Sequence, residues 1–427
     1  MTLHHADRRT FLKGTAALVA AAGASTALPF AAEAGTEDPG QLFKQGRFAD
    51  AERGYRRLLR QDPRDAHAHA QIGYIALLSN RFGTAEAHLS KATALAPGDI
   101  ASTQRLAECY VRQDQLARAV PLLRRTGRPR DAAFAKVYSH IEGTPWKVSG
   151  ARSTRVPFHT LDPVPSVEAS INGGRPEKFY LDTYATLDLS KEVAERAGLR
   201  ALATFEGGVV DAHPVVLYFG VLESFRIGDI EIRNIPVQWN DAQRPPLPDG
   251  SQAAGAFGTT IFYHFLTTMD YAGKALLLRR TPGAPRDEIT RLPLWLAGDH
   301  FPCSVGSLGD HPPKMVTIDT GGIGSALDTT VAIAEQYGLT VDYANPRERF
   351  GIKTYPVTAE RAALGNAVRH DVRGNAAEKV FPGLPGPGQS AQFGFDMIAN
   401  FTHEFFKPYA VTFDYSRMRM SISRGRR

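Results

Sequence analysis

Two stretches decide the fold of this chain: KFYLDTYATLDLS at residues 178–190 and KMVTIDTGGIGSALDTT at residues 314–330. Each opens with a short apolar run typical of a buried strand, and each run ends at an Asp-Thr pair. A helical pattern follows, at 190–197 and at 329–337, and each helix stops at Gly-Leu. The same order of elements occurs twice, so we expect two copies of one β-rich unit.

Further strands and turns extend both copies. In the first copy, apolar alternation between glycine and asparagine turns predicts strands at 165–171, 222–227 and 231–235. Near the end of each copy, FLTTMDY at 265–271 resembles YAVTFDY at 409–415. The duplication predicts a first lobe over residues 156–280 and a second lobe over residues 281–427.

Together, these residues resemble the retropepsin-like aspartic proteases over residues 156–424. The signature is an apolar strand, Asp-Thr-Gly as at 319–321, and a helix ending in Gly-Leu. The family also has an apolar-Gly pair shortly before its last strands, which Phe257-Gly258 and Phe393-Gly394 match. The resemblance implies an all-β domain of two lobes with short helices. It also implies a peptide or protein substrate, and no cofactor or metal.

The resemblance implies that Asp182 and Asp319 form a catalytic dyad. Two carboxylates about 3 Å apart do not both ionise easily, so one pKa rises and the other falls. The ionised carboxyl then activates water as a base, and the protonated one polarises the peptide carbonyl. In the family, the threonine beside each aspartate bonds to the opposite lobe. Thr183 and Thr320 match those positions, and Gly321 completes the second motif.

One position departs from the family pattern. Tyr184 follows Asp182-Thr183 where the family has glycine, and it adds a ring where glycine leaves the cleft floor open. The next residue, Ala185, again matches the family pattern. In the second copy, Gly322 is expected to shape the cleft as Ala185 does in the first. An exported aspartic endopeptidase is the first hypothesis. The alternative is a catalytically altered relative that binds peptide or a protein partner through the cleft and the helical module described next.

A repeat of 34 residues precedes the β-rich units. It is carried by three sets of residues: Phe48, Phe82 and Leu116; Ala51, Ala85 and Ala119; Tyr55, Leu89 and Leu123. This period resembles the tetratricopeptide repeat, in which small residues let two antiparallel helices approach. We expect helical repeats over residues 39–127 and a linker over 128–155. Both a groove for a protein partner and a structural spacer fit this module.

The first residues have the order of an export signal. DRRTFLK at 7–13 matches the twin-arginine motif, an apolar run follows at 14–24, and Ala32 and Ala34 form a cleavage site. The run is too short and too mildly apolar for a membrane span. We therefore expect residues 1–34 to be a twin-arginine signal peptide, and the mature protein to be periplasmic or secreted.

Composition and the absence of certain motifs argue against several other classes of protein, namely nucleic-acid-binding proteins, metalloproteins and other enzyme families. The net charge of +6 comes from arginines scattered along the chain, so no nucleic-acid partner is expected. Cys109 and Cys303 are the two cysteines and form no metal-binding pattern. His403-Glu404 lacks the second histidine of a zinc-protease helix, and neither a GxSxG motif nor a dinucleotide fingerprint occurs.

Overall fold

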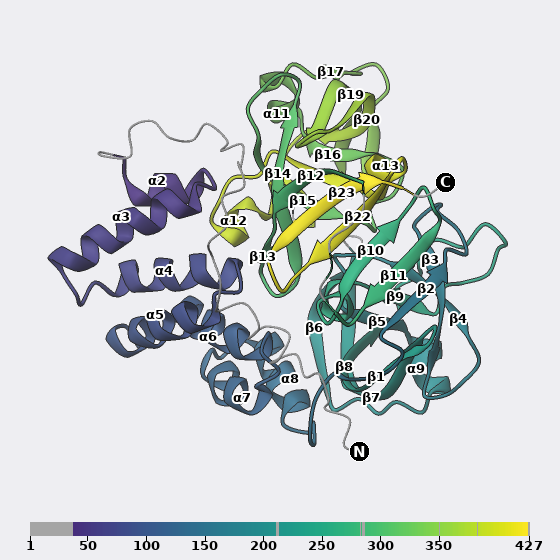
Figure 1. The fold of residues 1–427 in the computed structure, drawn as a ribbon, viewed down its shortest axis with the longest axis horizontal. Helices are drawn as coiled ribbons and strands as arrows, with labels where there is room; N and C mark the ends of the chain where they lie inside the picture. The colour runs from purple at the N-terminus through teal and green to yellow at the C-terminus, as the bar shows by residue number, and fades with distance from the viewer. Residues whose placement is uncertain are drawn as a thin grey trace.

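The computed structural model describes residues 37–210, 213–281, 283, 287–349, 351–381 and 383–425. The expected signal peptide, residues 1–34, lies outside the described residues. Helical repeats are followed by a mostly β region, as the sequence predicts (Figure 1). Among the described residues, no helix is long and apolar enough to cross a membrane.

The repeat period marks where the helices begin. Phe48, Phe82 and Leu116 are the first residues of α3, α5 and α7. Gly73 permits close packing of α4 and α5, because a Cβ there would lie 2.9 Å from a methyl group of Leu89. The helices are α2 (Pro39–Lys44), α3 (Phe48–Gln61), α4 (Ala66–Leu78), α5 (Phe82–Leu95), α6 (Ile100–Val111), α7 (Leu116–Arg125) and α8 (Pro129–Tyr138).

The segment 128–155, which we expected to be a linker, is largely structured. It contains α8, and β1 (Lys147–Gly150) and the start of β2 (Ser153–Pro157) follow. Proline suits the first turn of a helix because it has no N–H to leave unpaired, and Pro129 opens α8 in this way. The last helix therefore ends at Tyr138, and residues 139–146 connect it to β1.

The first lobe is built on an eight-stranded sheet. Besides β1, its strands are β3 (Ser166–Ile171), β4 (Glu177–Leu181), β5 (Leu187–Ser190), β6 (Ala203–Val210), β7 (His213–Ile227), β8 (Ile230–Asn240) and β9 (Gly255–Phe257). Their order is β1-β8-β5-β9-β4-β3-β7-β6. Two short helices, α9 (Lys191–Arg196) and α10 (Thr259–Phe262), follow β5 and β9.

The second lobe repeats this topology. Its strands are β13 (Trp295–Ala297), β14 (Phe301–Leu308), β15 (Lys314–Asp319), β16 (Leu327–Thr330), β17 (Thr340–Val341), β18 (Arg347–Arg349), β19 (Ile352–Leu364), β20 (Ala367–Ala377) and β21 (Ala399–Thr402). In both lobes the strand before the Asp-Thr pair is parallel to a later strand, as β4 is to β9 and β15 is to β21. The short helices of the second lobe are α11 (Val331–Gln336), η1 (Gly386–Gln389), α12 (Ser390–Phe393) and α13 (His403–Phe406).

A six-stranded sheet joins the two lobes. Its strands, in order, are β12 (Glu288–Pro293), β23 (Arg419–Arg424), β22 (Tyr409–Asp414), β10 (Leu266–Asp270), β11 (Ala275–Arg279) and β2. The two similar closing segments pair with each other at its centre, in antiparallel register through Thr268 and Thr412. Their hydroxyl oxygens lie 2.8 Å apart. The two copies seen in the sequence are therefore related by a pseudo-twofold axis in the structure.

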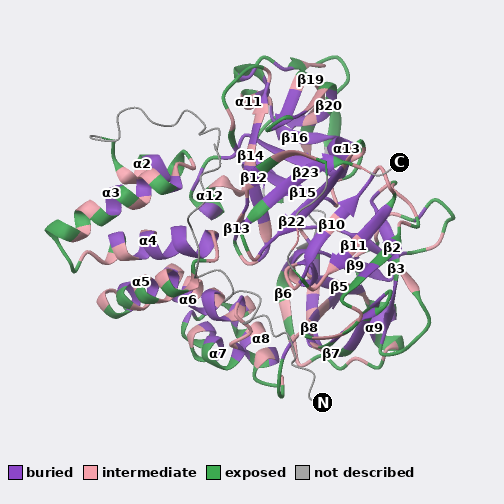
Figure 2. Cartoon of the chain, viewed as in Figure 1, coloured by how far each residue is buried: buried purple, intermediate pink, exposed green. Residues whose placement is uncertain are grey.

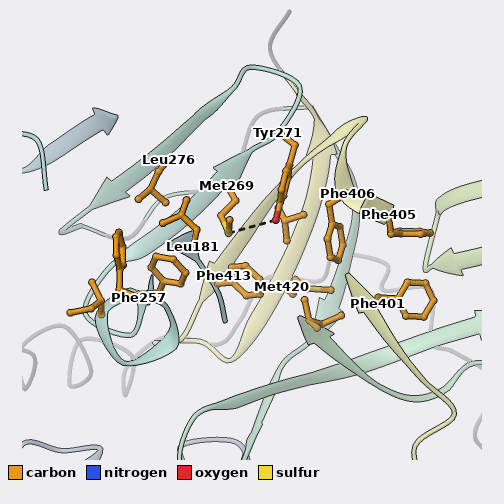
Figure 3. Packing of buried hydrophobic residues seen from close by; sticks show 14 of the residues in the cluster. Leu181, Phe257, Met269, Tyr271, Leu276, Phe401, Phe405, Phe406, Phe413 and Met420 are labelled. Carbon is orange, nitrogen blue, oxygen red and sulfur yellow. Dashed lines mark hydrogen bonds between the residues drawn. The ribbon is translucent and has the colours of Figure 1, made fainter. Parts of the chain in front are cut away.

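One continuous apolar core lies beneath the two Asp-Thr turns. Figure 3 shows its members from the first lobe, the joining sheet and the second lobe, among them Leu181, Phe257, Met269, Phe413, Phe401 and Phe405. The hydroxyl of Tyr271 donates to the sulfur of Met269 across 3.7 Å in this core. Because each large side chain buried here contributes about 1.5–3 kcal/mol, the core fixes the ends of β4 and β15.

The helical module packs against both lobes (Figures 1 and 2). Phe48 meets Trp295 and Phe395 of the second lobe at ring-centroid distances of 5.3 and 5.1 Å. On the first lobe, Ala133 and Val137 of α8 pack on β7. The buried guanidinium of Arg112 donates to the carbonyl of Gly298 across 2.8 Å. This face of the module is therefore covered by the β region.

Candidate active site

The two Asp-Thr turns meet at the junction of the lobes. The hydroxyl of Thr183 donates to the carbonyl of Ile318 across 2.7 Å and accepts from the N–H of Thr320 across 3.0 Å. The hydroxyl of Thr320 donates to the carbonyl of Leu181 across 3.1 Å and accepts from the N–H of Thr183 across 2.9 Å. Both threonines are 0% exposed. Four reciprocal bonds therefore hold the two turns together.

Each aspartate is oriented by its own turn. The N–H of Tyr184 donates to Oδ1 of Asp182 across 2.7 Å, and the N–H of Gly321 donates to Oδ1 of Asp319 across 2.9 Å. A Cβ on Gly321 would lie 2.6 Å from Oδ2 of Asp182. The carboxyl group of Asp182 therefore lies against the backbone of the turn that carries Asp319, and only glycine leaves room for it.

The environment of Asp319 favours its protonated form. Burial raises the pKa of Asp319 well above its usual value, and the negative charge of Asp182 raises it further. Hydrogen bonds from Asn400 and from the N–H of Gly321 act in the opposite direction, since they stabilise the carboxylate. Burial and the neighbouring charge prevail, so the pair has the electrostatics of two carboxylates that share one proton.

Asn400 is a site residue that the sequence interpretation missed. Its Nδ2 donates to Oδ2 of Asp319 across 3.1 Å, while its Oδ1 accepts from the hydroxyl of Thr317 across 2.8 Å. The side chain is 0% exposed and also contacts Asp328, with Nδ2 3.4 Å from its Oδ2. The amide is therefore held in one orientation and presents its donor to Asp319.

Asn400 lies on β21, and this strand corrects the expected position of the second apolar-Gly pair. We assigned the second apolar-Gly pair to Phe393-Gly394, but β21 is the strand that runs parallel to β15, with Phe401 beside Ile318 and Thr402 beside Asp319. In the first lobe Phe257 lies beside Leu181. The partner of Gly258 is thus Thr402. Extending the similarity of the closing segments backward by eight residues would have aligned Phe257 with Phe401.

Gly258 and Thr402 occupy equivalent positions, but the backbone of the first lobe requires glycine and that of the second lobe does not. A Cβ on Gly258 would collide with the carbonyl of Asp182, so that position requires glycine. Thr402 has an ordinary extended backbone with φ −102°, and its hydroxyl accepts from the N–H of Glu404 to cap α13. The Phe393-Gly394 pair instead closes α12, with Gly394 at φ +80°, and Phe393 packs against the helical module.

Tyr184 reaches from the first lobe into the second. Its ring packs edge-on against Phe301 at 4.9 Å. Its hydroxyl donates to Oε1 of Gln389 across 2.9 Å and lies 3.3 Å from Oδ1 of Asn400. The residue that departs from the family pattern is therefore linked to Asp319 through the Asn400 amide. Ala185 is buried on the first lobe, and a Cβ on Gly322 would lie 2.9 Å from Cβ of Thr402.

A chain of polar contacts connects the helical module to the first turn. Arg130 of α8 pairs with Oδ2 of Asp299 at 3.0 Å, and Oδ1 of Asp299 pairs with Nδ1 of His300 at 2.7 Å. Nε2 of His300 lies 2.6 Å from the carbonyl of Tyr184. Burial lowers the pKa of His300, but Asp299 and this carbonyl outweigh it and raise the pKa above its usual value.

Among the residues that the structure describes, one cluster outside the dyad has metal-ligand residue types: Asp162, His403 and Glu404. The ammonium group of Lys407 already bonds two of them, at 2.7 Å from Asp162 and 2.6 Å from Glu404. The place between the two carboxyl groups is therefore already occupied by a cationic side chain of the protein itself.

Comparison with known families agrees with this architecture. Residues 41–100 and 76–139 match tetratricopeptide repeat families, and residues 167–261 match an aspartyl protease family. The chain joins tetratricopeptide repeats to an aspartyl protease domain. The protease match spans the first lobe and includes Asp182. The second lobe lies outside this match and repeats the topology of the first lobe.

Other comparisons add little to this assignment. No curated protein matches the chain. Among solved structures, one match is a mutant O-GlcNAc transferase of Thermobaculum terrenum, at 21% identity and a TM-score of 0.23. That match covers 25% of this chain and 22% of the transferase chain, and it carries no argument about function.

Proposed function

We propose that the protein is an exported aspartic endopeptidase, which hydrolyses peptide bonds with water activated by Asp182 and Asp319. The observation that supports this proposal is the set of four reciprocal bonds that Thr183 and Thr320 make between the two Asp-Thr turns, next to the two oriented carboxyl groups. A site that only needed to bind peptide would not require two carboxylates in so costly an arrangement, since burial of like charges is unfavourable.

The electrostatics suggest a role for each aspartate. Asp319 has the raised pKa and holds the shared proton, while Asp182 is the ionised base. Asp182 takes a proton from water as the water oxygen bonds to the peptide carbonyl carbon. Asp319 gives its proton to the carbonyl oxygen. When the tetrahedral intermediate collapses, the carboxyl of Asp319 recovers a proton from the oxygen, and Asp182 passes its proton to the leaving amine.

Export is proposed from the sequence alone. The motif at 7–13, the apolar run at 14–24 and the Ala32–Ala34 cleavage site support a twin-arginine signal. A fusion of residues 1–34 to a reporter that is active only outside the cytoplasm tests this. Arg8→Lys with Arg9→Lys is expected to abolish the reporter signal, and an unchanged signal would contradict the proposal.

The catalytic proposal is tested with Asp182→Asn and Asp319→Asn. Both variants keep the side-chain shape, and each is expected to lower peptide cleavage by at least about 10³-fold, since a dyad member is lost. Asp371→Asn is the matched control, because Asp371 is exposed on β20 and has φ +51°, which asparagine tolerates. Full activity in both dyad variants would refute the assignment.

The alternative function is peptide or protein binding without cleavage, through the cleft and the helical module. Tyr184 and Thr402 favour it, because both replace glycine beside an aspartate. Binding of a pepstatin-type transition-state mimic separates the two functions. Tight binding with a raised melting temperature supports a working dyad. Capture of peptides by wild type with no cleavage between pH 3 and 8 supports the alternative.

A further inference from the structure

Tyr184 is bonded through its N–H, its carbonyl and its hydroxyl, each to a different segment of the chain. Its N–H donates to Oδ1 of Asp182 across 2.7 Å and so orients that carboxyl group. Its carbonyl accepts from Nε2 of His300 across 2.6 Å, and its hydroxyl donates to Oε1 of Gln389 across 2.9 Å. The equivalent residue of the second turn is Gly321, which has no side chain and still donates its N–H to the aspartate of its own turn. Orienting a carboxyl group therefore does not require the tyrosine side chain, and the contacts of this side chain have another role.

A first connection from the helical module is polar and reaches the carbonyl of Tyr184. Arg130 of α8 pairs with Asp299 at 3.0 Å, and Asp299 pairs with Nδ1 of His300 at 2.7 Å. His300 is 5% exposed, and its ring stacks on Phe301 with the centroids 4.3 Å apart, so the imidazole has little freedom to turn. A carbonyl oxygen only accepts hydrogen bonds, so Nε2 carries a proton that points at the turn. The position of α8 therefore affects the backbone of the Asp182 turn through three side chains.

A second connection is aromatic and reaches the ring of Tyr184. The centroid of Phe301 lies 4.9 Å from that of Tyr184 and 5.6 Å from that of Phe393. The carbonyl of Phe393 accepts from the hydroxyl of Tyr74, a residue of α4, across 3.1 Å. Both Tyr74 and Phe393 are buried. Helix α4 is thus connected to Tyr184 through two phenylalanine residues.

The segment that carries Gln389 is also fixed by the helical module. Gln389 is the last residue of η1, and α12 follows directly. Just beyond α12, the N–H of Asp396 donates to the carbonyl of Lys44 at the end of α2 across 2.8 Å. Phe395 in the same segment packs edge-on against Phe48 of α3 at 5.1 Å. The acceptor of the tyrosine hydroxyl therefore belongs to a segment that the first helices of the module hold in place.

We propose that the helical module positions the Asp182 turn, with Tyr184 as the positioning residue at which these three connections meet. The Tyr184 N–H passes the constraint to the carboxyl group of Asp182, so displacement of the module is expected to misorient this carboxyl group. A small misplacement of a catalytic group lowers the rate of the chemical step strongly. The effect on catalysis rests on the proposed function, whereas the coupling between the module and the turn does not.

Four variants of the full chain test the polar connection. Arg130→Met removes the part of the connection that belongs to the module. Arg118→Met is its matched control, because Arg118 pairs with Glu86 at 2.6 Å within the module. His300→Leu removes the donor to the Tyr184 carbonyl, and His300→Gln supplies an N–H donor again.

Hydrogen–deuterium exchange read by mass spectrometry measures the coupling without any need for cleavage. Residues 178–190, which contain the turn, are expected to exchange about fivefold faster in Arg130→Met and in His300→Leu, as suits the loss of one hydrogen bond. Residues 352–364 in β19 are the internal reference for a general loss of stability and should exchange as in wild type. Exchange at 178–190 that is unchanged in Arg130→Met, or that rises equally at 352–364, would overturn the proposal.

Peptide-cleavage kinetics separate positioning from a purely structural role. In Arg130→Met, kcat is expected to fall about tenfold with KM unchanged, because the Asp182 carboxyl group is misoriented while the peptide contacts remain. Arg118→Met should keep both constants, and His300→Gln should recover most of the kcat that His300→Leu loses. Faster exchange with the kcat of wild type would show that the module stabilises the turn without positioning it, and this too would overturn the proposal. If wild type cleaves no peptide, the proposed function fails, and the exchange measurement alone decides whether the module and the turn are coupled.

Discussion

Replacing Thr183 by valine tests what holds the two lobes together at the dyad. Valine has nearly the same shape but no hydroxyl, so it leaves the carbonyl of Ile318 and the N–H of Thr320 without their partners. Both groups are buried at the lobe junction. Each buried polar group left unpaired costs about 1–3 kcal/mol, so we expect Thr183→Val to lower the free energy of unfolding by about 2–6 kcal/mol.

Urea unfolding followed by tryptophan fluorescence measures this loss. Trp239 lies in the first lobe and Trp295 in the second, so the signal reports both. Thr340→Val is the matched control, because Thr340 is an exposed strand residue, and a change within about 0.5 kcal/mol is expected. Thr183→Ser restores a hydroxyl and should recover most of the loss. If Thr183→Val cost no more than Thr340→Val, the reciprocal bonds would not be what joins the lobes.

Three further predictions concern the residues around the dyad. Asn400→Leu removes a hydrogen bond to the Asp319 carboxylate that is worth about 1.5–3 kcal/mol, so the pKa of Asp319 should rise. The alkaline limb of the pH–rate profile should therefore move to higher pH by about one to two pH units, and a move to lower pH would contradict this. Tyr184→Gly should lower peptidase activity and melting temperature, because the ring contacts Phe301 and the hydroxyl joins the Asn400 network. A rise in activity would instead show that the ring obstructs the cleft. Asp299→Asn should destabilise the protein more at pH 6 than at pH 9. Asp299 raises the pKa of His300, so this ion pair stabilises the fold only while the imidazole is protonated. Thermal unfolding of wild type and variant at both pH values measures the difference.

Local patterns predicted the elements of this chain well. Phe48, Phe82 and Leu116 mark helix starts because the repeat is set by packing between neighbouring helices, which the 34-residue spacing records directly. Gly198 and Gly338 end their helices with φ of +69° and +70°, a conformation that glycine adopts without strain. Such features depend on residues close in sequence, so the sequence alone was sufficient.

The site depended on contacts between distant segments. The apolar-Gly pattern at Phe393-Gly394 was present but misleading, because the strand beside β15 is chosen by parallel pairing across about 80 residues and not by a local motif.

The sequence by itself therefore determined the two kinds of domain, the repeat and the two Asp-Thr turns. Only the tertiary structure decided what surrounds the aspartates. The amide of Asn400 and the link from Arg130 through His300 to the Tyr184 carbonyl both join segments that lie far apart in the chain. Such contacts leave no periodic trace in the sequence, because each is set by the packing of whole lobes and helices against one another.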